Sequence, residues 1–147
     1  MQYADSAGGG TEGLILYYYG VCLDRTSLSD NAHRWLKQVK KRNRFGLRNW
    51  PGALVRWFLG ELDGSAVLME GCRTSSLEAA LSRAKTDRLA RRRLIEICFH
   101  KAVHALRQGE QSRSLELFET VVSLENPSIS TEWYLARHEA DRLRLSS

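Results

Sequence analysis

The chain has 147 residues, a net charge of +5, 43% hydrophobic residues, 27% charged residues and two prolines. That length suits one domain with a buried core, and that composition is typical of an ordinary globular protein. No apolar run reaches the ~18 residues that a membrane span requires, so we expect a globular protein without one.

The first part of the chain is expected to be a lead segment followed by a single domain. Residues 1–11 contain three consecutive glycines and no periodicity, which predicts a flexible lead before a domain over residues 12–145. The apolar run at 13–21 lacks the basic flank and small-residue cleavage site of a signal peptide, and Cys22 does not complete a lipoprotein box. The cytoplasm is therefore the default compartment, and the periplasm follows if an upstream signal was removed.

Helical periodicity recurs along the chain, and strand-like alternation is absent. An apolar helix is expected from about residue 12 to residue 23, and Ser29-Asp30 should cap a second helix with Trp35 on its apolar stripe. Pro51 should stand in the first turn of a third helix that closes at Gly60. The pattern as a whole predicts an all-α fold. Further helices are expected at 66–70, within 74–86, and at 131–145.

A complete helix–turn–helix unit is predicted over residues 94–127. One apolar stripe ends before Gly109, and a second begins almost at once and stops at Pro127. Helices joined by so short a turn pack antiparallel, and the small residues Ala102 and Ser114 lie where close approach requires them. The stripes consist of Ile95, Cys98, Phe99, Ala102, Val103 and Leu106, then of Leu115, Leu117, Phe118, Val121, Val122 and Leu124.

The order of these features resembles a tetratricopeptide repeat, whose period is about 34 residues. With the strings ValArgTrpPheLeuGly at 55–60 and GluTrpTyrLeuAlaArg at 132–137, the chain is similar to the C-terminal half of bacterial adaptors of the new lipoprotein I type. Lys101 stands where the repeat usually has a leucine. The resemblance implies antiparallel helix-pair repeats in an α-solenoid with a C-terminal capping helix. It also implies a non-catalytic scaffold or adaptor that binds a protein or peptide and self-associates as a homodimer.

The partner is expected to bind in a groove lined by exposed side chains of the first helices, such as His100, His104 and Arg107. His100 and His104 are four residues apart, a spacing that a metal ion can bridge, but no third ligand is local. The three cysteines are widely and irregularly spaced, which is typical of free thiols. We therefore expect no metal site, no cofactor and no catalytic residue.

Two basic blocks, at residues 37–48 and 83–93, favour an alternative function, nucleic-acid binding, because phosphates attract such clusters without a specific motif. A solvated helix face or a surface for an acidic partner explains the same charges. Trp35 lies beside the first block, where core packing is expected rather than stacking on bases. A nucleic-acid binder should merge both blocks on one face. The basic patch consists of Lys37, Lys40, Lys41, Arg44, Arg88, Arg91 and Arg92.

Overall fold

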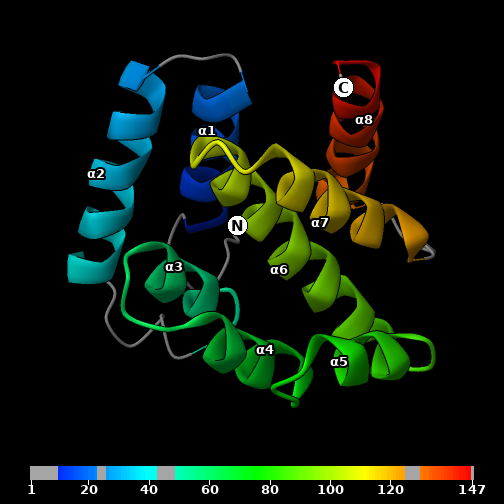
Figure 1. Cartoon of the computed structure of the whole chain (residues 1–147). Coiled ribbons are helices and arrows are strands. Elements are labelled where there is room, and N and C mark those ends of the chain that lie inside the picture. Colours follow the sequence, from blue (N-terminus) through cyan, green and yellow to red (C-terminus); the bar gives the residue numbers. More distant parts are fainter. Residues whose placement is uncertain (1–9, 23–25, 43–48, 125–129, 147) are drawn as a thin grey trace. The chain divides into compact units, whose positions relative to one another are not determined.

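The computed structural model describes residues 10–22, 26–42, 49–124 and 130–146, and all secondary structure among them is α-helical (Figure 1). The all-α prediction is confirmed for these residues. The chain divides into two compact units, Met1–Gly71 and Cys72–Ser147. The single domain over 12–145 and the solenoid arrangement of helix pairs stay predictions. The helices are α1 (Gly10–Cys22), α2 (Thr26–Arg42), α3 (Gly52–Phe58), α4 (Gly64–Cys72), α5 (Leu77–Ala84), α6 (Arg88–Arg107), α7 (Gln111–Ser123) and α8 (Thr131–Ser146).

In the first unit, α1 and α2 form an antiparallel pair whose close approach depends on two glycines (Figure 1). A Cβ atom on Gly13 would lie 2.6 Å from Leu36 Cδ2, and one on Gly20 would lie 2.5 Å from Ser29 Oγ. The predicted cap at Ser29-Asp30 is wrong. α2 begins earlier, at Thr26, and Ser29 is a buried residue inside the helix, since its hydroxyl fills the space beside Gly20.

Trp35 differs from its predicted position in the core. The buried stripe of α2 is Ala32, Leu36 and Val39, whereas Trp35 is 41% exposed at the edge of that stripe. A Cβ atom on Gly13 would lie 2.8 Å from Trp35 Cδ1, so the indole rests over the glycine of α1 and turns its other side to solvent. The core-packing prediction for this side chain is therefore wrong.

Phe58 connects α3 to the α1–α2 pair. Its ring centroid lies 4.7 Å from that of Tyr17 on α1 and 5.5 Å from that of His33 on α2. Pro51 is the N-cap residue of α3, after a cis Trp50–Pro51 peptide bond, rather than a residue of its first turn. Gly60 has a φ of 84° just past α3, so the predicted close of this helix is confirmed.

In the second unit, α6 and α7 pack antiparallel around the turn at Gly109, which has a φ of 81° (Figure 1). The Ser114 hydroxyl donates a hydrogen bond of 2.8 Å to the Ala102 carbonyl oxygen, which confirms the predicted close contact. Asp87 caps α6 by accepting a bond of 3.0 Å from the Ala90 amide. The helix therefore begins at Arg88, and the basic run before residue 94 belongs to its first turns.

The last helix, α8, packs on α7 and is tied to it by a hydrogen bond of 2.9 Å from Trp133 Nε1 to the Leu124 carbonyl oxygen. The apolar stripe of α8 is buried at Ala136, Ala140 and Leu143. Two acidic residues of α8, Glu132 and Glu139, are buried as well, which the apolar pattern did not predict. Pro127, the predicted stop of α7, lies outside the described residues.

Candidate functional site

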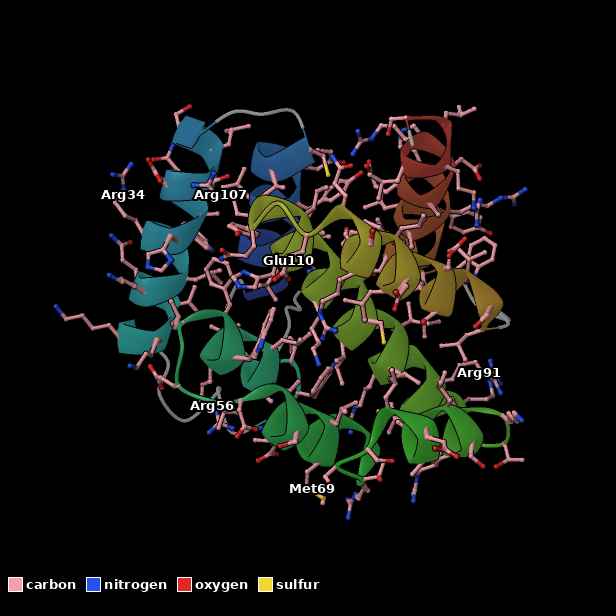
Figure 2. The ribbon with its side chains drawn as sticks, in the orientation of Figure 1. Arg34, Arg56, Met69, Arg91, Arg107 and Glu110 are labelled. Atoms are coloured by element: carbon pink, nitrogen blue, oxygen red, sulfur yellow. The ribbon has the colours of Figure 1, made fainter. Side chains whose placement is uncertain are left out.

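The C-terminal half of α6 and the start of α7 carry a group of polar side chains around their shared turn, which Figure 2 shows at its labelled residues Arg107 and Glu110. His104 and Gln108 contact each other, with 3.5 Å between their Nε2 atoms. The negative charge of Glu110 acts on His104 as well and favours its protonated form. We call this the α6–α7 surface. It consists of Lys101, His104, Arg107, Gln108, Glu110 and Arg113.

Lys101 is the electrostatically unfavourable member of the α6–α7 surface. Its side chain is half-buried, and the loss of water around its ammonium group lowers its pKa. The positive charge of Arg113 adds to that shift. Among the described residues, no carboxylate forms an ion pair with Lys101. A desolvated cation next to a second cation lacks the negative partner that would stabilise it.

The three residues predicted to contact a partner, His100, His104 and Arg107, differ in how far they are exposed to solvent. Arg107 is exposed and His104 is half-buried, and burial lowers the pKa of His104 against the opposing charge of Glu110. His100 is only 5% exposed, so the prediction that it is an exposed side chain is wrong. It faces α8, where its Nε2 lies 3.9 Å from Glu132 Oε2, and burial lowers its pKa to about 3.

Glu132 stands in the first turn of α8 and completes a buried polar pair with His100. Burial raises the pKa of Glu132. Hydrogen bonds from its own backbone amide and from the Ser130 side chain lower it, as does the positive charge of Arg92. Glu132 therefore lies beside the Ser130 hydroxyl. In a catalytic triad the histidine stands between the hydroxyl and the acid, and His100 does not have that place here. Within the described ranges, no three His, Cys, Asp or Glu side chains are grouped so that they could hold a metal ion.

The second basic block is partly occupied by contacts within its own unit. Arg91 Nε donates a bond of 2.8 Å to the Ala84 carbonyl oxygen and Arg91 Nη2 one of 3.3 Å to that of Lys85, so this guanidinium satisfies the end of α5. Figure 2 shows Arg91 beside that turn. Arg88 and Arg92 are exposed.

The first basic block belongs to the other unit, where Lys37, Lys40 and Lys41 are exposed on α2. Arg44 lies outside the described residues. That the two blocks merge on one face stays a prediction.

No family model, curated protein or solved structure matches this chain. The all-helical fold is compatible with a helical repeat, and the tetratricopeptide resemblance stays a prediction. Of the helices described, none is both long enough and apolar enough to cross a membrane.

Some residues of these sites were not found by the reasoning from sequence, for different reasons. Lys101 had a local signal, since it is a charged residue beside an apolar helical stripe. Glu132 had a weaker one, as an acid next to the apolar positions of α8. Arg113 had none, because its importance comes from a neighbour on another helix, Lys101.

Proposed function

We propose that this chain is a non-catalytic interaction module of the helical-repeat type that binds an acidic segment of a partner protein on the α6–α7 surface. The observation that carries the proposal is Lys101, a half-buried cation beside Arg113 that has no ion-pair partner among the described residues. A partner carboxylate placed there would pair with a charge that is already partly desolvated. Such a pair is stronger than one formed at a fully hydrated surface, because less water has to be removed.

The neighbours of Lys101 support an acidic partner rather than a basic one. Arg107 and Arg113 are exposed and positive, and Glu110 is the one acidic member of the surface. The packing of consecutive helices, α5 on α6, α6 on α7 and α7 on α8, is the kind of arrangement that presents an extended surface in repeat proteins. Arginine is also a frequent anchor at protein interfaces, since its planar group binds carboxylates through two hydrogen bonds.

The test is a crosslinking pull-down with the tagged chain, carried out with and without nuclease and read by mass spectrometry. A discrete protein that survives nuclease is expected, with recovery lowered about tenfold by Lys101→Gln or Arg113→Gln. Lys85→Gln is the matched control, since it removes the same charge from an exposed lysine outside the α6–α7 surface. Equal losses in all three variants would show that net charge, not this surface, retains the partner.

The alternative, nucleic-acid binding, is favoured by one observation on α2. Trp35 is 41% exposed on a helix that also carries exposed Arg34 and Lys37, and Figure 2 shows Arg34 projecting away from α1. An exposed indole among cations is able to stack on an unpaired base. Binding of a single-stranded oligonucleotide that falls steeply with salt and is lost in Trp35→Ala would favour this function. Recovery that vanishes with nuclease in the pull-down would agree with it.

Self-association through α1 is part of the same proposal. Tyr19 of α1 is 44% exposed, although Leu14 and Tyr18 of that helix are buried. Sedimentation at high micromolar concentration tests the dimer, and Tyr19→Ser is expected to weaken it. A chain that stays monomeric across that range would remove this part of the proposal without affecting the α6–α7 surface.

A further inference from the structure

A pocket in the first unit lies between the last turns of α2 and the segment that joins α3 to α4. Its volume is about 480 Å³, which is within the range of small-molecule sites. Leu59 and Glu61 line it from the α3–α4 segment. The other lining residues are three lysines of α2, namely Lys37, Lys40 and Lys41, and we call the whole the lysine pocket.

The lysine pocket has an excess of positive charge. Lys40 forms an ion pair with Glu61 across the pocket. Among the residues that the structure describes, Lys37 and Lys41 have no such partner. The pocket is therefore lined by three lysines and one glutamate, and two of these lysines have no acidic partner within the described part of the chain. The pocket is suited to an anion with at least two negative charges.

The position of these lysines in α2 accounts for only part of the arrangement. Cations near the C-terminal end of a helix interact favourably with its dipole. Lys37 and Lys41, however, are four residues apart on one helix face, and like charges at this spacing destabilise a helix by a few tenths of a kcal/mol. Together with Lys40 they line one pocket, where a bound anion would offset this repulsion.

We propose that the lysine pocket binds a compact, multiply charged phosphate compound. Phosphate oxygens accept hydrogen bonds from ammonium groups, and two or more linked phosphates match the free charges of Lys37 and Lys41. Glu61 holds Lys40 in place and limits the excess charge, while Leu59 offers an apolar contact to the rest of the ligand. This site lies in the first unit and is independent of the partner surface in the second.

Calorimetric titration of the full chain with inorganic triphosphate at low salt is the test. Lys37→Gln and Lys41→Gln are each expected to weaken binding about tenfold, because each removes one charge-assisted contact. Glu61→Gln is expected to strengthen binding several-fold, since it removes the competing carboxylate and frees Lys40. Lys85→Gln, which lowers the net charge equally outside the pocket, is expected to leave the affinity unchanged.

Three results would overturn the proposal. The first is no heat of binding at millimolar triphosphate with a correctly folded chain, as judged by circular dichroism. The second is an equal loss in Lys85→Gln and in the pocket variants, which would mean that triphosphate responds only to net charge. The third is binding of a single-stranded oligonucleotide without any binding of triphosphate, which would assign the lysines to a nucleic-acid surface instead.

Discussion

The hydroxyl of Ser114 on α7 donates a hydrogen bond of 2.8 Å to the carbonyl oxygen of Ala102 on α6, and both residues are fully buried. Ser114→Ala is expected to lower the free energy of unfolding by about 1 kcal/mol, because one buried hydrogen bond is lost. Ser114→Leu is expected to cost more, about 2–3 kcal/mol, since the larger side chain must push the helices apart. Urea unfolding and hydrogen exchange of α6 and α7 measure both. Equal effects of the two substitutions would contradict the close contact.

The partly buried ammonium group of Lys101 is expected to lower the free energy of unfolding of the chain. Lys101→Leu should raise the free energy of unfolding by about 1 kcal/mol, because it replaces a partly desolvated cation by an apolar side chain. The same variant should lose binding of the acidic partner, which is the trade-off expected at a functional position. Lys85→Leu, at an exposed position, is the control and should give no gain. A Lys101→Leu variant that is stabilised and still binds would remove Lys101 from the proposed site.

The two glycines of α1 are expected to differ in their sensitivity to substitution. A Cβ atom on Gly20 would lie 2.6 Å from the backbone nitrogen of Ser29, which cannot move without shifting α2. A Cβ atom on Gly13 would meet side-chain atoms of Leu36 and Trp35, which can rotate. Gly20→Ala should therefore destabilise the α1–α2 pair by about 2–3 kcal/mol and Gly13→Ala by less. Hydrogen exchange of α1 and α2 gives the order, and the reverse order would count against this packing.

Buried His100 predicts a loss of stability in mild acid. Its pKa is lowered to about 3 in the folded chain by burial, whereas an unfolded histidine has a pKa of about 6.5. Between these values the unfolded state binds a proton that the folded state does not, so stability falls as pH falls from about 6.5 towards 3. The slope is at most on the order of 1 kcal/mol per pH unit. Glu132 acts in the opposite direction, because its raised pKa lets the folded state hold a proton above the usual range.

His100→Gln is the variant that isolates this effect. It should unfold with a smaller dependence on pH between about 6.5 and 5 than the parent chain, as measured by urea unfolding at each pH. His138→Gln is the matched control, because it removes an exposed histidine of α8 and leaves His100 in place. A parent-like pH profile in both variants would contradict the role given to His100.

The three cysteines are expected to react with a thiol reagent in a fixed order. Burial raises the pKa of Cys72 to about 11 and that of Cys98 to about 12, and both side chains are inaccessible in the folded chain. Cys22 is half-buried. Because the thiolate is the reactive form, Cys22 should be alkylated first and the other two only after local unfolding. Mass spectrometry of iodoacetamide-treated protein gives the order, and fast labelling of Cys98 would contradict its burial.

Much of the helical structure could be predicted because its signals are local. Gly109 closes α6 with a positive φ, Asp87 caps the same helix, and Asp63 caps α4 by accepting a bond of 2.8 Å from the Ala66 amide. Each of these interactions involves residues within a few positions along the chain, so sequence spacing contains the necessary information. The antiparallel α6–α7 pair follows from the same kind of signal, since a short turn leaves little other choice.

The sequence by itself determined the all-α class, the order of the helices and the close contact between α6 and α7. Only the tertiary structure decided which polar side chains are buried, paired or left exposed. His100 and His104 share one helical spacing, but α8 supplies Glu132 to the first, and the second stays half-buried at the surface. Trp35 lies over Gly13 of α1 and is still 41% exposed. Such outcomes depend on contacts between helices that are distant in the sequence, and no local pattern encodes them.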